Sequence, residues 1–183
     1  RADLARARGV IEDATGVRVL GYRAPSFSID RRTPWAHPVL AEEGYAYSSS
    51  VAPLHHDHYG WPGAPRGPWH PVEDSDFVEL PVTLARFLGR DVTTGGGFFR
   101  LLPASVTDRA IDAANDAERS AVFYFHPWEI DPGQPRVKDA PLKSKLRHYS
   151  RLGAMRGKLA GLLTRHPWDR VDHVLGMAQP TLA

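Results

Sequence analysis

The stretch VRVLGYRAP, residues 17–25, decides the fold class because it lies between two segments with helical patterns. Its β-branched and aromatic residues predict a strand, which Pro25 ends. Before it, residues 2–15 place apolar side chains at helical spacing, and Gly16 follows as a helix stop. The chain therefore opens with a helix followed by a strand.

The same order repeats directly downstream. Thr33 can cap a helix with Pro34 in its first turn, and Gly44 can end it. A second short strand is predicted at residues 45–51. Alternating helices and strands are typical of an α/β protein with a mostly parallel sheet, in which functional groups gather at the carboxyl ends of strands.

The remainder combines one long irregular segment with further regular elements. Residues 53–76 lack periodicity and are rich in Pro, Gly, His and Trp, which predicts a long surface loop that binds a ligand. Further predicted elements are strands at 77–83 and 121–128, helices at 103–118 and 141–166, and a glycine-rich turn at 95–103.

Composition sets broad limits. The chain has 183 residues, of which 42% are hydrophobic, and this is enough for a single domain over 1–183. With 0 Cys, the sequence excludes disulfides, thiolate zinc sites and cysteine nucleophiles. No apolar run has the length of a membrane span, so we expect no membrane-spanning helix. The compartment and the oligomeric state stay open.

Charge is uneven along the chain. Residues 1–140 carry 15 Lys and Arg against 19 Asp and Glu, a net of −4, and residues 141–183 carry 8 against 2, a net of +6. A basic end can bind nucleic acid or anionic lipid. Regularly spaced apolar residues in 141–166 instead favour a packed amphipathic helix, so we expect no nucleic-acid partner.

Two predicted strands end in candidate functional residues. Arg23 follows the first strand, where a guanidinium can bind a carboxylate in a bidentate manner, although a structural ion pair or plain exposure is the favoured interpretation of Arg23 alone. His126 ends the apolar strand at 121–128, where it can be a general acid or a metal ligand. A buried, hydrogen-bonded structural histidine is equally consistent with that position.

Two other clusters are weaker candidates. His55, His56 and His58 have loop spacing and predict solvated residues, or residues that line a ligand groove with Tyr59 and Trp61, rather than a metal site. Residues 95–97, GGG, lack a phosphate-loop pattern and predict tight backbone packing.

Taken together, six motifs resemble one family. They are GYRAPSFSI, LAEEGYAYSSSV, HHDHYGWPGAPR, ELPVT, GGGFFRLLP and FYFHPWEIDPGQPR, in this order along almost the whole chain. The set is similar to the polysaccharide deacetylases with a NodB-type domain, in particular the subfamily associated with bacterial exopolysaccharide and exosortase (PEP-CTERM) loci.

The resemblance implies a distorted (β/α) barrel, a divalent metal that is usually zinc, and hydrolysis of N-acetyl groups on hexosamines of a bacterial polysaccharide. It implies that His126 is the general acid and that Arg23 orients an aspartate that acts as base. The substrate-binding residues that follow from the motifs are Pro25, Phe27, Tyr59, Trp61 and Trp128.

The sequence also departs from that family. The Asp-Asp pair and the HxxxH pair that bind the metal do not occur here, and Ser48 stands where relatives often place an aspartate that supports the histidine. We therefore expect a C-terminal portion of the domain that lacks its first βα units, with the metal ligands and the base upstream of Arg1. On this interpretation the 183 residues alone have no deacetylase activity. The alternative is a non-catalytic glycan-binding or scaffold module.

Overall fold

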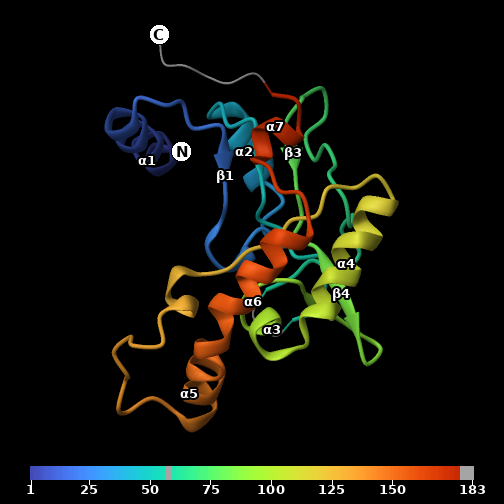
Figure 1. Ribbon diagram of the computed structural model, residues 1–183. Helices are drawn as coiled ribbons and strands as arrows, with labels where there is room; N and C mark the ends of the chain where they lie inside the picture. The colour runs from blue at the N-terminus through green and yellow to red at the C-terminus, as the bar shows by residue number, and fades with distance from the viewer. Residues whose placement is uncertain (57–58, 178–183) are drawn as a thin grey trace. The chain divides into compact units, whose positions relative to one another are not determined.

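The structure is a computed structural model that describes residues 1–56 and 59–177 (Figure 1). The chain forms two compact units. The first comprises residues 1–82 with the segment that begins at Asp169, and the second comprises residues 83–168.

The helices of the first unit are α1 (Ala2–Thr15), α2 (Ala36–Glu42) and α7 (Val171–Val174). The prediction for residues 2–15 is confirmed, and Gly16 ends α1 in the left-handed conformation at φ 67°. The prediction that Thr33 caps α2 is wrong. Its hydroxyl donates to Ser28 O at 2.9 Å and accepts the N–H of Asp30 at 3.1 Å, so it closes the preceding turn instead.

The sheet of the first unit contains three very short strands: β1 (Gly21–Tyr22), β2 (Tyr47–Ser48) and β3 (Val78–Glu79). They run parallel in the order β1-β2-β3. The predicted positions and parallel direction are therefore confirmed, but each strand is shorter than predicted. At the end of β1 the chain turns through a 3-10 helix, η1 (Pro25–Phe27).

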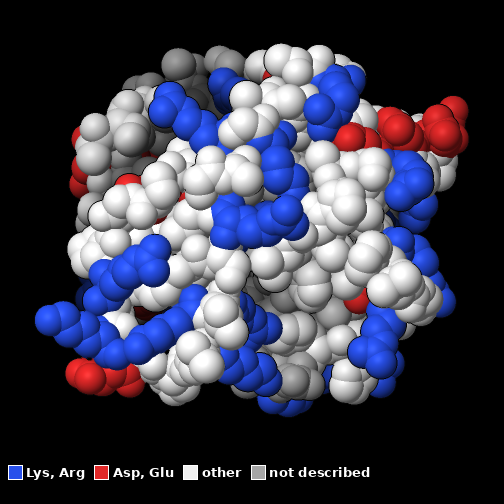
Figure 2. All heavy atoms as spheres, turned by 60° about the horizontal axis from the view of Figure 1, so that its bottom comes forward, with Lys and Arg blue, Asp and Glu red and all other residues white. Residues whose placement is uncertain are grey.

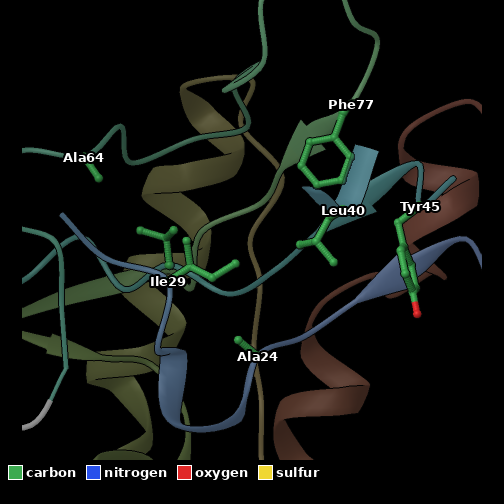
Figure 3. Close-up of a cluster of buried hydrophobic side chains, with 7 residues drawn as sticks. Ala24, Ile29, Leu40, Tyr45, Ala64 and Phe77 are labelled. Carbon is green, nitrogen blue, oxygen red and sulfur yellow. The ribbon is translucent and has the colours of Figure 1, made fainter. Parts of the chain in front are cut away.

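A hydrophobic core lies beside this sheet (Figure 3). Leu40 of α2 is buried in it together with Tyr45, just before β2, and Phe77, just before β3. The remaining members are Ala24, Ile29, Val51 and Ala64. The core thus fixes the segments that follow β1 and β2, where Arg23 and the 48–50 serines lie.

The second unit begins with a two-stranded antiparallel hairpin, β4 (Leu84–Phe87) and β5 (Arg90–Thr93), which the sequence did not predict. The elements α3 (Gly96–Leu101), α4 (Ala104–Asp116) and the 3-10 helix η2 (Pro127–Ile130) follow. The predicted helix at 141–166 is divided into α5 (Leu142–Tyr149) and α6 (Leu152–Arg165), because Arg151 adopts a left-handed φ of 57°.

The strand predicted at residues 121–128 is not formed. The segment is extended but only partly paired: Val122 bonds with Thr83, and Tyr124 O accepts the N–H of Gly96 at 3.0 Å. Residues 121–124 are half-buried and Phe125 is exposed, so the segment is an apolar edge rather than a central strand.

Helix α6 forms the centre of the second unit, beside α3 and α4 (Figure 1). Its Met155, Leu159 and Leu162 pack with Phe99 and Ile111 in the core. The protein is thus a mixed α/β protein with small sheets and several helices, and the described residues contain no closed barrel. Within residues 1–56 and 59–177, none of the helices is both long and apolar enough to span a membrane.

Candidate functional site

The first unit places Arg23 where β1 ends, as predicted. The side chain is largely exposed, its Nη2 donates to Ser49 Oγ at 2.7 Å, and its guanidinium lies 5.5 Å from the ring centre of Phe27. Ser49 in turn donates to Leu80 O at 2.7 Å. Arg23 is therefore anchored to the residues that follow β2 and β3.

Phe27 connects Arg23 to the long loop. It is buried, with its backbone at a left-handed φ of 49° beside Ser26 at 56°, and such conformations are costly for residues with side chains. The ring of Tyr59 lies 5.8 Å from that of Phe27, and Tyr59 stacks on His56 at 4.0 Å. Arg23, Phe27 and Tyr59 thus form one cluster, with Pro25 exposed at its edge.

Trp61 lies elsewhere in this unit. Its ring stacks on buried His37 at 6.3 Å and packs against the hydrophobic core, so its predicted role in substrate binding has no counterpart in the Arg23 cluster. His58 lies outside the described residues.

A buried polar network, which the sequence analysis missed, surrounds Glu79 in β3. Glu79 Oε1 accepts the N–H groups of Ser50 and Val51 at 2.7 and 2.8 Å, and Oε2 lies 3.1 Å from His37 Nε2. Ser48 Oγ donates to Ser50 Oγ at 2.7 Å, and both residues are fully buried. Ser48 therefore has a structural role in the turn after β2.

The second unit contains a pocket of about 480 Å³ that includes His126 and Trp128. Its walls come from the start of α3, the segment 124–129, and α5 with the loop before it. His126 is exposed, so its imidazole is accessible from solvent. The alternative of a buried structural histidine therefore does not hold at this position.

The backbone around His126 is fixed on both sides. Glu129 Oε2 accepts the His126 N–H at 3.0 Å across the first turn of η2. Upstream, a side chain at Gly95 would place its Cβ 2.1 Å from Tyr124 O, so only glycine permits this approach. Gly96, at φ 56°, donates its N–H to the same carbonyl. The predicted tight packing of residues 95–97 is thus confirmed for Gly95 and Gly96, whereas a Cβ at Gly97 would meet only Arg100 at 3.8 Å.

Trp128 is the centre of a column of aromatic rings in the pocket. His126 stacks beside it at 5.7 Å and His148 of α5 stacks on it at 4.0 Å. His148 Nε2 lies 2.7 Å from Gln134 Oε1, which fixes the ring. Trp128 therefore joins the predicted histidine to α5 through stacked rings.

Beneath these rings lies a buried ion pair that sequence reasoning also missed. Arg100 Nη1 lies 3.3 Å from Glu129 Oε1, and their side chains are 1% and 0% exposed. Arg100 Nη2 donates to Arg147 O at 2.6 Å, and Arg100 lies 5.1 Å from the Trp128 ring centre. Burial lowers the pKa of Arg100, although a guanidinium stays protonated in proteins. The one sequence feature that could have indicated this buried pair is the position of Arg100 within the apolar run FFRLL.

The described residues do not bring together a metal site. Among residues 1–56 and 59–177, no group of three or more His, Asp or Glu side chains could hold a metal ion. Arg23 lies in the first unit and His126 in the second.

Comparison with known proteins identifies one family. The model described as "Domain of unknown function (DUF3473)" matches residues 49–176, which is more than half of the chain. No curated protein matches the chain, and no solved structure does. The matched region includes the whole second unit and therefore the whole pocket around His126.

Proposed function

We propose that this chain, which belongs to the DUF3473 family, is part of a polysaccharide deacetylase that hydrolyses N-acetyl groups on hexosamines of a bacterial exopolysaccharide. The finer fold that we propose is the distorted (β/α) barrel of such enzymes, to which these 183 residues contribute a C-terminal portion. The observation that carries the proposal is His126, an exposed imidazole in an aromatic pocket of about 480 Å³.

The geometry of the pocket supports sugar binding. Its volume lies within the range of small-molecule sites, and its walls combine aromatic rings with a few polar groups. Rings that are held by Gln134 and by the Arg100–Glu129 pair need little reorganisation when a ligand binds. A pyranose ring can therefore lie against this surface with its substituents near His126.

His126 has a defined task in amide hydrolysis. Water adds to the acetyl carbonyl, the C–N bond breaks, and the leaving nitrogen needs a proton. A protonated His126 imidazole would donate that proton, releasing acetate and the free amine. Arg23, anchored on Ser49, would orient the carboxylate that takes the proton of the water.

The described residues do not fit a divalent metal, because no three of their His, Asp or Glu side chains are placed to hold one together. On this proposal, residues other than these 183 bind the metal, which the family resemblance suggests is zinc, and supply the aspartate that acts as base.

The test is acetate release by the complete gene product from N-acetylglucosamine oligomers. His126→Gln should lower kcat by about 100-fold or more, in the range expected for loss of a general acid. His173→Gln, a change of the same kind in α7, should leave kcat unaltered. Unchanged kcat in the His126 variant would overturn the role assigned to His126.

A second candidate function is a glycan-binding module without catalysis. The lack of a metal-ligating group among the described residues favours it. Tight glycan binding by the complete gene product, with no acetate released in the presence of zinc, would select this function.

A further inference from the structure

Arg100 carries hydrogen-bond donors that the protein does not use. Its Nε and Nη1 are buried and have no hydrogen-bond partner among the described residues, and the same is true of Glu129 Oε1. The ion pair at 3.3 Å balances charge without satisfying these groups. Buried donors without acceptors are destabilising, so a wall residue that carries them points to an acceptor supplied from outside.

The side chains around Arg100 select for negative charge. Lys145 and Arg147 line the same pocket, and among the described residues that line it the one carboxylate is that of Glu129, which is buried against Arg100. Two carboxylates of the neighbouring loop, Asp131 and Asp139, line neither this pocket nor the next. The pocket therefore carries an excess of positive charge.

The excess continues beyond the pocket. A second hollow of about 350 Å³ shares Val137, Lys145 and Tyr149 with the first and adds Arg136 and Lys138. On the face shown in Figure 2, Lys and Arg side chains are spread widely, and Asp and Glu lie mostly near the edges. The two hollows, of about 480 and 350 Å³, share three lining residues and together form a basic groove, defined here by the residues that line them.

We propose that the basic groove binds an acidic glycan, in which carboxylate-bearing sugars alternate with, or flank, the N-acetylated hexosamine. The hexosamine lies at the rings around His126, one carboxylate accepts from Arg100, and others lie along Lys138 and Lys145. The substrate class rests on the proposed function, whereas the binding of acidic sugars rests on the groove alone.

Planar guanidinium donors match a carboxylate, and the aromatic rings match a sugar better than they match a lipid headgroup. Tyr149 strengthens the case for a preformed site. Its hydroxyl accepts the N–H of Val137 at 3.0 Å, which fastens the loop to α5 along the groove.

The test is direct binding of three hexasaccharides to the complete gene product by calorimetry. Hyaluronan hexasaccharide carries a carboxylate on every second sugar, its carboxyl-reduced form has the same backbone without charge, and chitohexaose is neutral and fully N-acetylated. The acidic form should bind about tenfold or more tightly than its reduced form, as expected for charged hydrogen bonds. This advantage should shrink as salt rises.

Matched lysine variants locate the contact. Lys138→Gln and Lys145→Gln should each weaken binding of the acidic form by about threefold, the size expected for partly exposed charges, and leave the reduced form unaffected. Lys143→Gln is the control, because Lys143 lies in α5 with Lys145 but lines neither hollow. Arg100→Lys keeps the charge but loses the fork of donors and should weaken binding further than either lysine variant.

Equal affinity for the acidic and reduced forms would overturn the proposal. So would an equal loss in the Lys143 variant, or binding of a single-stranded oligonucleotide of equal charge as tightly as the acidic hexasaccharide, since either would indicate a general polyanion surface. Acetate release is measured separately. Acidic binding without acetate release would contradict the proposed function alone, and acetate release from chitohexaose without any preference for acid would contradict this inference alone.

Discussion

The carboxylate of Glu129 accepts the main-chain N–H of His126 at 3.0 Å while being fully buried. The same carboxylate forms an ion pair with Arg100 at 3.3 Å. The main chain at His126 and the pocket wall at Arg100 therefore both depend on the side chain of Glu129. Four predictions about stability follow from this and from similar buried contacts.

Replacing Glu129 by Gln should destabilise the protein by about 3 kcal/mol or more, because it leaves the Arg100 charge buried without a counter-ion. The free energy of unfolding in urea measures this. Glu118→Gln, at an exposed site in the same unit, should change it by less than about 0.5 kcal/mol. Equal stability of the two variants would mean that the buried pair contributes nothing.

Lys158 fastens the end of the helix that carries Arg100. Its ammonium donates to Phe99 O and, at 2.5 Å, to Leu102 O, which are carbonyl groups at the C-terminus of α3. Lys158→Met should therefore cost about 1.5–3 kcal/mol in urea unfolding. Arg156→Met, at an exposed position of α6, the helix that carries Lys158, serves as the control. A loss of the same size in this variant would refute the stabilising role of Lys158 at the end of α3.

The network around Glu79 predicts that an apolar side chain of similar size cannot replace the glutamate, because the surrounding N–H groups need an acceptor. Glu79→Gln keeps an oxygen for the N–H groups of Ser50 and Val51, so we expect a small loss, about 1 kcal/mol. Glu79→Leu leaves both donors unsatisfied and should cost about 2–6 kcal/mol, at 1–3 for each. Thermal or urea unfolding of the two variants distinguishes these cases, and a Leu variant as stable as the Gln variant would contradict the prediction.

Asp30 should make stability depend on acid. The side-chain hydrogen bond from Arg32 lowers the pKa of Asp30 by more than burial of the carboxyl raises it. The resulting stabilisation is complete above the unfolded pKa of ~3.9 and is lost as pH falls through the lower folded pKa.

Arg32→Gln should accordingly destabilise the protein at pH 7, and this difference should diminish toward about pH 2. An NMR titration should also show the pKa of Asp30 rising in the variant. Arg31→Gln is the matched control, since Arg31 donates to Pro62 O instead. If the cost of Arg32→Gln is the same at every pH, the ion pair is not its cause.

Several elements were predictable from local pattern. Helix α1 follows from helical spacing and from Gly16, because both signals lie within one element. The division of the predicted 141–166 helix does not, since apolar spacing continues past Arg151 and no residue type there signals a left-handed backbone. The segment 121–128 has strand composition, but a strand forms only where a neighbouring segment supplies a continuous run of hydrogen bonds, and tertiary structure decides this.

The candidate site was predictable in part. His126 was found from its place after an apolar run and Trp128 from the family resemblance, and both line the same pocket. Arg100 was missed because charged residues in sequence predict exposure, whereas here Glu129, almost thirty residues later, makes burial possible. Pairings of this kind are properties of the fold and leave no local signal.

Helix α5 supplies Lys145, Arg147 and His148 to the pocket and has no buried residue, whereas α6 buries Leu152 and three further apolar side chains. On the proposed function, the residues that select the ligand lie in α5 and those that form the core lie in α6, on either side of Arg151. We expect substitutions at exposed positions of α5 to cost less stability than substitutions of the buried residues of α6. A randomised library confined to the exposed positions of α5 would therefore vary the proposed groove while leaving the core unchanged.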